Sequence, residues 1–347
     1  MSSANIKTGG ELYLKYVIDG LDGDYAVKRY YMEDIFKRFY HIRNSILKRA
    51  VINVYGCFVF PSNSYFVIDS QYHSRYLLLY RLILKLLCKT KTIALVMHLD
   101  NYDSRGNNKW YSLLQDKIYF YFTDHIVTIS EYVKNEIISL NVNNSKISVI
   151  RPGYEKRIPY KHCDKTKKNL LFVGHLIPRK GVLELIDIFA SIREPDVILH
   201  IVGDAAKDKK YAKRIFSRIS EKNLNSRVII HGRVGEEDLA KLYSCADLFI
   251  MPSLKEGFCI VLLEAMSYKL PIVANNIEVL KELVIPGKNG NIADINNKNE
   301  FAAAIVQLLN DGNRMKNMGL WGYENILPNY NWEITKKRFK SVVNELL

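Results

Sequence analysis

The chain has 347 residues, which exceeds one average domain, so two domains are expected. Hydrophobic residues make up 48% and charged residues 25%, the composition of an ordinary soluble globular chain. No uncharged apolar run reaches the roughly 18 residues of a membrane-spanning helix, and no secretory signal is predicted at the N-terminus.

The net charge of +14 is distributed unevenly along the chain. Residues 1–168 hold 26 Lys/Arg and 15 Asp/Glu, whereas residues 169–347 hold 24 and 21. The first half also contains 18 of the 23 tyrosines. A basic, aromatic half beside a nearly neutral half indicates two domains with different partners.

In the first half, short apolar segments predict strands around one strongly apolar helix at 75–89. That helix carries Arg81, Lys85 and Lys89 in a single stripe, and the rest of its surface is nearly apolar. In chain order we predict a helix at 10–20, the turn Asp22–Asp24, a strand at 25–31, a strand at 65–69, the apolar helix, and strands at 92–98 and 125–130.

The second half alternates apolar strands with amphipathic helices, the pattern of a parallel sheet covered on both faces. The predicted strands are 169–174, 196–204, 227–232, 247–253 and 270–275, and the predicted helices are 181–192, 209–222, 236–246 and Gly257–Tyr268.

These patterns predict the α/β fold class and a division into domains. The N-terminal domain is expected at 1–150 and a basic linker at 151–168. The C-terminal domain is expected at 169–330, followed by one helix at 331–347 that packs back toward the N-terminal domain.

Five cysteines, an odd number, are widely spaced as Cys57, Cys88, Cys163, Cys245 and Cys259. No CxxC pair or His/Cys cluster occurs, so neither a disulfide framework nor a structural zinc site is predicted. This cysteine usage favours a reducing compartment.

Two glutamates flank an otherwise uncharged apolar run in "KEGFCIVLLEAM", residues 255–266. With a helix starting at Gly257, Glu264 would lie about 12 Å along the axis from Glu256. That exceeds the roughly 5–9.5 Å between the two carboxylates of a glycosidase, so the pair is expected to grip two ends of a long ligand. The helix N-terminus at Gly257 suits a phosphate between them.

Several motifs together resemble the retaining glycosyltransferases of family 4, which have the GT-B fold of two Rossmann-like domains facing a central cleft. The segment "PSLKEGFCIVLLEAM" resembles their E-x7-E signature, and "FVGHLIPRKG" resembles their glycine- and lysine-containing loop. Further similarity lies in "HGRV", which ends at Val234, in "LAKLYSCADLFIMPS", and in "KTGGE", "VMHLD" and "HIVTISEYVKNEI" of the first half.

The resemblance implies an N-terminal acceptor domain and a C-terminal domain for a nucleotide sugar, from UDP or GDP. It implies that Glu256 contacts the donor sugar's hydroxyls and Glu264 the ribose, while His98 touches the sugar. Lys180 is expected to meet the diphosphate; the family's second cation is an arginine at the position of His175. The other expected donor-binding residues are Gly9, Gly10, Arg179, Val234, Gly257, Phe258 and Cys259.

Four of these positions have plainer interpretations. Arg179 could replace His175 at the phosphates, or be a solvated surface arginine. Cys259 lacks a neighbouring base and is expected to pack rather than react. Gly9 and Gly10 could form a loop against the phosphate, or a plain turn.

The predicted function is therefore a retaining hexosyltransferase that acts in the synthesis of a glycan, a glycolipid or a cell-surface polysaccharide. A sugar-nucleotide 2-epimerase of GT-B-like fold and a basic nucleic-acid-binding protein are the alternatives. For the second, no binding module is recognisable, so nucleic acid is not an expected partner.

No metal cofactor is expected, because the single D-x-D, Asp22–Asp24, reads as a turn. The acceptor is expected to be a glycan or a lipid-linked molecule. The basic, aromatic segment 25–49 and the apolar helix 75–89 suggest a cytoplasmic protein on the anionic inner face of a membrane.

Overall fold

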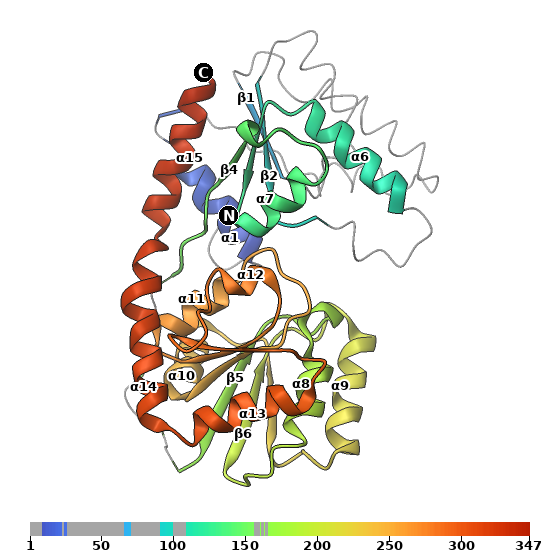
Figure 1. Ribbon diagram of the computed structural model, residues 1–347, viewed down its shortest axis with the longest axis vertical. Helices are drawn as coiled ribbons and strands as arrows, with labels where there is room; N and C mark the ends of the chain where they lie inside the picture. The colour runs from blue at the N-terminus through green and yellow to red at the C-terminus, as the bar shows by residue number, and fades with distance from the viewer. Residues whose placement is uncertain are drawn as a thin grey trace. The chain divides into compact units, whose positions relative to one another are not determined.

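The computed structural model describes residues 9–22, 24–25, 66–70, 91–99, 109–155, 160, 163 and 166–347. The chain divides into two compact units (Figure 1). The first consists of Met1–Pro152 with Trp332–Leu347, and the second of Gly153–Asn331. The predicted helix at 75–89 and residues 26–49 of the basic segment lie outside the described residues.

The described strands of the first unit form one parallel sheet in the order β1-β2-β3-β4. Buried apolar residues of β2 and β3 pack with residues of the following helices, among them Tyr119, Phe120, Val133 and Ile137. The elements are β1 (Phe66–Ser70), β2 (Lys91–Val96), β3 (His125–Thr128), β4 (Ile147–Val149), α1 (Gly9–Asp19), α6 (Lys109–Tyr121), α7 (Glu131–Ile138), η4 (Asn144–Lys146) and α15 (Trp332–Leu346).

The last helix of the chain, α15, packs against the first described helix, α1. The ring of Trp332 stacks on Tyr16 at a centroid distance of 4.2 Å. The hydroxyl of Thr335 donates a hydrogen bond to the carbonyl of Arg151 at 2.8 Å. Buried Tyr13 of α1 likewise donates to the carbonyl of Ile150 at 2.9 Å. These contacts make α15 part of the first unit although it follows the second in sequence.

The second unit contains a six-stranded parallel sheet in the order β10-β9-β8-β5-β6-β7. Its first strand in sequence, β5, lies beside its fourth, β8, so the chain runs outward in opposite directions from this pair. The strands are β5 (Lys168–Val173), β6 (Val197–Val202), β7 (Val228–Gly232), β8 (Leu248–Met251), β9 (Ile272–Asn275) and β10 (Gly290–Ala293). A sheet of this order binds its ligand at the carboxyl ends of the two strands where the direction reverses.

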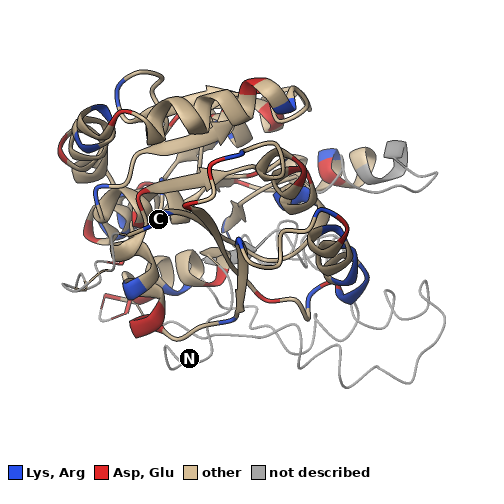
Figure 2. Cartoon of the chain, turned by 90° about the horizontal axis from the view of Figure 1, so that it is seen from below, with Lys and Arg blue, Asp and Glu red and all other residues tan. Residues whose placement is uncertain are grey.

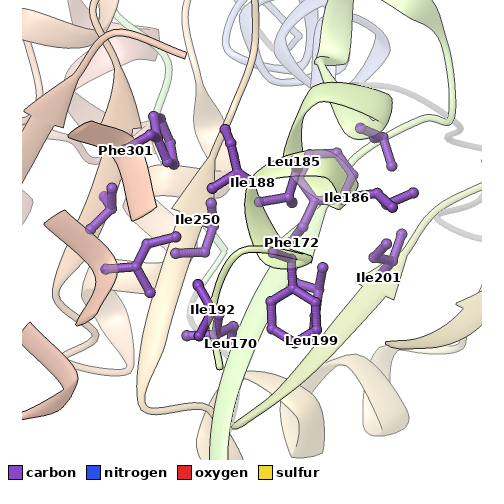
Figure 3. Packing of buried hydrophobic residues seen from close by; sticks show 14 of the residues in the cluster. Leu170, Phe172, Leu185, Ile186, Ile188, Ile192, Leu199, Ile201, Ile250 and Phe301 are labelled. Atoms are coloured by element: carbon purple, nitrogen blue, oxygen red, sulfur yellow. The ribbon is translucent and has the colours of Figure 1, made fainter. Parts of the chain in front are cut away.

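Helices cover both faces of this sheet. Alternate strand residues such as Leu170, Phe172 and Ile250 point to one face, where they pack with Leu185 of α8 and Phe301 of α13 (Figure 3). On the opposite face, Tyr243 of α10 stacks on Phe249 of β8. The helices are η5 (Pro178–Lys180), α8 (Val182–Phe189), α9 (Lys209–Glu221), α10 (Glu236–Cys245), α11 (Ile260–Ser267), α12 (Glu278–Lys281), α13 (Lys298–Leu309), α14 (Gly312–Trp321), η6 (Gly322–Ile326) and η7 (Leu327–Asn329).

A disulfide joins Cys163 to Cys245 at the end of α10. The prediction that the cysteines form no disulfide is therefore wrong for this pair. The two residues are 82 positions apart, so local spacing gave no indication of their proximity. The expectation of a reducing compartment loses its basis, because disulfides persist in oxidising surroundings. Cys259 is free and buried.

Within the described part of the chain, no helix has the length and apolar character needed to cross a bilayer. The turn predicted at Asp22–Asp24 is present, because the amides of Asp24 and Tyr25 both donate to the carbonyl of Leu21. Basic and acidic residues are interspersed on many of the described helices (Figure 2).

Candidate active site

The loop after β5 and the loop after β8 are in direct contact at the point where the sheet reverses direction. The amide of Leu254 donates to the carbonyl of Arg179 at 2.8 Å. Gly181 has a φ of +66°, and a Cβ there would lie 2.1 Å from the carbonyl oxygen of Pro252. Only glycine permits this approach, so the sequence "RKG" brings the two loops together.

Glu256, in the loop after β8, is buried with an exposed fraction of 7%. Its Oε1 lies 2.5 Å from Nζ of Lys180, and its Oε2 lies 3.0 Å from Nη1 of Arg179. The same Nη1 donates to the carbonyl of Lys255 at 3.1 Å. Arg179 is thus paired with Glu256, while its side chain remains 34% exposed.

The charge state of Glu256 follows from these contacts. Burial alone would raise the pKa of Glu256, but the charges of Lys180 and Arg179 and the hydrogen bond from Lys180 outweigh burial and lower that pKa. The carboxylate is therefore ionised at neutral pH. Two cations against one carboxylate leave this cluster with an excess positive charge that suits an anionic ligand.

The helix that follows Glu256 begins later than predicted. Gly257 and Phe258 belong to the loop, Cys259 is the N-cap, and α11 starts at Ile260. Phe258 is buried beside Tyr330, with ring centroids 5.8 Å apart, and so fixes the loop before the helix. The separation of about 12 Å expected from a helix beginning at Gly257 consequently does not apply.

Two helix N-termini follow the two central strands. Gly181 precedes α8 and Cys259 precedes α11, and neither N-cap residue makes a side-chain hydrogen bond to its helix. The first amides of a helix have no partner within the helix and carry partial positive charge. At α8 the amide of Leu183 already donates to the hydroxyl of Tyr211 at 3.2 Å, so it is the first amides of α11, together with Lys180 and Arg179, that make this edge of the sheet suited to phosphate.

Glu264 lies on α11 and is also buried, with an exposed fraction of 7%. Its Oε2 accepts a hydrogen bond of 2.9 Å from the hydroxyl of Tyr243 on α10. Tyr243 is not among the site residues predicted from the sequence. Its only signal was its place in the motif "LAKLYSCAD". Glu256 and Glu264 therefore have different partners, two cations for one and a phenol for the other.

His175 and Cys259 contribute little charge. Burial lowers the pKa of His175, and the neighbouring cations Lys207 and Lys180 lower it further, so this imidazole is neutral at pH 7. Burial raises the pKa of the Cys259 thiol, and the charge of Glu256 adds to this effect. The thiol lies 3.6 Å from the sulfur of Met251, in keeping with the expected packing role.

The remaining predicted site residues lie elsewhere in the described structure. Val234 is half-buried between β7 and α10 of the second unit. His98, also half-buried, follows β2 in the first unit. Gly9 and Gly10 are the first two residues of α1, not a loop before it as expected. Among the described residues, no three His, Cys, Asp or Glu side chains are grouped as metal ligands.

Residues 155–324 match the model of a protein family described as glycosyl transferases, group 1. An uncharacterized glycosyltransferase of Methanocaldococcus jannaschii is 33% identical over 224 residues, which cover 65% of this chain and 60% of that protein. A GDP-mannose-dependent α-(1-6)-phosphatidylinositol monomannoside mannosyltransferase of Mycolicibacterium smegmatis is 29% identical over 64% of this chain and 62% of that protein. The chain thus matches less than two thirds of the length of these relatives.

Among solved structures, Anabaena HepE in complex with UDP-glucose is similar with a TM-score of 0.77, at 18% identity, over 98% of this chain and 97% of that one. Sucrose-phosphate synthase from Thermosynechococcus elongatus has a TM-score of 0.70, at 22% identity, over 81% and 73%. At these identities the likeness concerns the fold. The predicted fold class is confirmed: the chain is α/β, with a parallel sheet in each of two domains, as in the GT-B fold.

Replacing Lys180 by methionine should lower the free energy of unfolding by about 3 kcal/mol, because it leaves the buried carboxylate of Glu256 with Arg179 as its one paired cation. The Lys180→Met, Glu256→Gln double variant should recover part of that loss. The pKa of Glu256 is lower in the folded state, so the stabilisation is complete above about pH 4.3 and disappears as the pH falls through the folded value.

Urea unfolding at pH 7, followed by circular dichroism, measures these differences. Lys298→Met is the matched control, because Lys298 pairs with Asp187 in an exposed position and its loss should cost less than about 1 kcal/mol. Equal destabilisation in all three variants would contradict the central role of the buried pair.

Proposed function

Residues 155–324 belong to the group 1 glycosyl transferases, and from that match we propose that the chain transfers a hexose from a nucleotide-diphosphate donor to an acceptor hydroxyl, with retention at the anomeric carbon. The observation that carries the proposal is the contact of Glu256 with Lys180 and Arg179 where β5 and β8 end. This contact places a carboxylate that can accept hydrogen bonds from sugar hydroxyls beside two cations that can bind phosphate. It lies at the ligand-binding edge of a doubly wound sheet.

In this proposal the charged side chains of the site in the second unit have distinct roles. Glu256 accepts hydrogen bonds from the donor sugar's hydroxyls. Lys180, Arg179 and the first amides of α11 stabilise the charge that develops on the departing diphosphate. Glu264 accepts hydrogen bonds from the ribose. Arg179 takes the place of the arginine that the family carries at the position of neutral His175.

The bond from the anomeric carbon to the donor phosphate breaks, and a bond from that carbon to the acceptor oxygen forms. We propose that an oxygen of the leaving phosphate takes the proton of the acceptor hydroxyl. The Cys259 thiol has a raised pKa and is unsuited to act as a nucleophile. In the first unit, His98 is proposed to contact the donor sugar, and Gly9 and Gly10 the phosphate.

The donor is proposed to be a UDP- or GDP-sugar. The HepE structure holds UDP-glucose, and the mycobacterial relative is named as GDP-mannose-dependent. We propose that the product is a glycan, a glycolipid or a cell-surface polysaccharide.

A membrane-proximal acceptor is supported by α6 of the first unit. Its residues Leu114, Ile118 and Tyr121 share one side of the helix and are 45%, 37% and 73% exposed, with Lys117 exposed among them. An apolar stripe beside a cation suits the boundary between lipid headgroups and acyl chains. We therefore propose that the protein works on an anionic membrane surface.

Glu256→Gln and Glu264→Gln should have different kinetic effects. Loss of the carboxylate at 256 should act on kcat, by about 2–4 kcal/mol of transition-state stabilisation, because it contacts the sugar being transferred. Loss at 264 should mainly raise KM for the donor, because the ribose does not react. Steady-state transfer assays with UDP- and GDP-sugars measure both parameters, and full activity in both variants would refute the assignment.

Transfer should proceed without a divalent metal, because Lys180, Arg179 and the amides of α11 supply positive charge at the diphosphate. The expected result of dialysis against EDTA is therefore unchanged activity. Activity that is lost on dialysis and restored by manganese would contradict this proposal.

Binding to phosphatidylglycerol vesicles should exceed binding to phosphatidylcholine vesicles and should weaken with salt, since the Debye length is only about 8 Å at physiological ionic strength. Leu114→Gln with Tyr121→Gln should reduce co-sedimentation severalfold. Phe216→Gln is the matched control, because Phe216 is a 49% exposed aromatic residue of the second unit. Equal recovery in the supernatant under all conditions would indicate a soluble acceptor.

A further inference from the structure

We propose that Tyr243 is a positioning residue for Glu264, and so determines how well the site distinguishes ribose from deoxyribose. The inference rests on the proposed function, which assigns the ribose to Glu264. Its basis is the hydrogen bond of 2.9 Å from the Tyr243 hydroxyl to Oε2 of Glu264. Tyr243 has an exposed fraction of 0%, so solvent does not compete for its hydroxyl.

The ring of Tyr243 has little freedom to move. It stacks on Tyr268 at a centroid distance of 5.2 Å and an interplanar angle of 9°. It also stacks on Phe249 of the central strand β8, at 5.9 Å. A phenol fixed by two aromatic neighbours presents its hydroxyl at a defined position, with little conformational entropy left to lose.

The backbone around Tyr243 is tethered as well. The hydroxyl of the next residue, Ser244, accepts a hydrogen bond of 2.8 Å from the amide of Tyr160. Cys245 forms the disulfide to Cys163. The carboxylate of Asp247 accepts a hydrogen bond of 2.8 Å from the amide of Asn169. The end of α10 is thus attached to the chain segment that leads into β5.

A glutamate side chain has three rotatable bonds, and its carboxylate binds a diol well only in one orientation. A charge-assisted hydrogen bond from a rigid phenol selects that orientation before the ligand arrives. In the proposed function Glu264 binds the ribose, and Tyr243 acts through Glu264.

The decisive experiment compares wild type with Tyr243→Phe, which keeps the ring and removes the hydroxyl. Dissociation constants for UDP and for 2′,3′-dideoxy-UDP, and for the two corresponding guanine nucleotides, are measured by isothermal titration calorimetry. Wild type should prefer the ribonucleotide, and Tyr243→Phe should reduce that preference about tenfold, with binding of the dideoxynucleotide unchanged. In transfer assays KM for the donor should rise while kcat stays within about twofold.

The control is Tyr132→Phe, which removes a longer, part-buried Tyr–Glu hydrogen bond, 3.3 Å from Tyr132 to Glu136, in the first unit. It should leave nucleotide binding unchanged. In the Glu264→Gln background, Tyr243→Phe should have no further effect on ribose preference. Glu264→Gln already removes the carboxylate that the Tyr243 hydroxyl orients.

Full ribose preference in Tyr243→Phe would overturn the inference and leave Tyr243 a packing residue. If this variant does not fold, Glu264→Asp provides the second test, because it withdraws the carboxylate from the phenol but keeps the charge. Ribose preference that survives in Glu264→Asp would also overturn the inference. Failure of the proposed function has a different signature, which is that wild type binds neither nucleotide or that Glu264→Gln binds both as well as wild type.

Discussion

A carboxylate can be buried in a protein only where cations or hydrogen-bond donors compensate for the water it has lost. Glu256 meets this requirement with Lys180 and Arg179, and its position decides much of the second unit. The two cations come from the loop after β5 and the carboxylate from the loop after β8, 76 residues later for Lys180. Adjacent central strands are what allow these loops to meet.

The second unit combines an apolar core with a charged cluster at one edge of its sheet. The apolar cluster is formed by alternate strand residues and by residues of helices such as α8 and α13, and it extends to Phe172 and Ile250 near the carboxyl ends of β5 and β8. The charged groups occupy the loops at those ends, where backbone contacts such as that of Gly181 with Pro252 hold them. In the proposed function, Arg179 supplies the positive charge that neutral His175 does not.

Much of the second unit could be predicted from the sequence, because buried parallel strands and amphipathic helices have distinct local periods. The first residue of α11 could not, since "GFC" is compatible with a helical start and only the burial of Phe258 beside Tyr330 keeps it in the loop. The pairing of Arg179 with Glu256, and of Tyr243 with Glu264, depends on contacts between distant segments. Periodicity carries no information about such contacts. The family resemblance indicated the glutamates but not their partners.

The disulfide at the end of α10 makes this part of the fold sensitive to its surroundings. In the chain-entropy description, closing a loop of 82 residues restricts the unfolded chain by an amount worth about 4–5 kcal/mol. A glutathione-rich cytosol would remove that contribution and leave Ser244 and Asp247 to hold the helix by hydrogen bonds. The oxidised and the reduced protein thus have different free energies of unfolding. The difference arises because the disulfide restricts the unfolded chain, and the contacts of the folded sheet are the same in both.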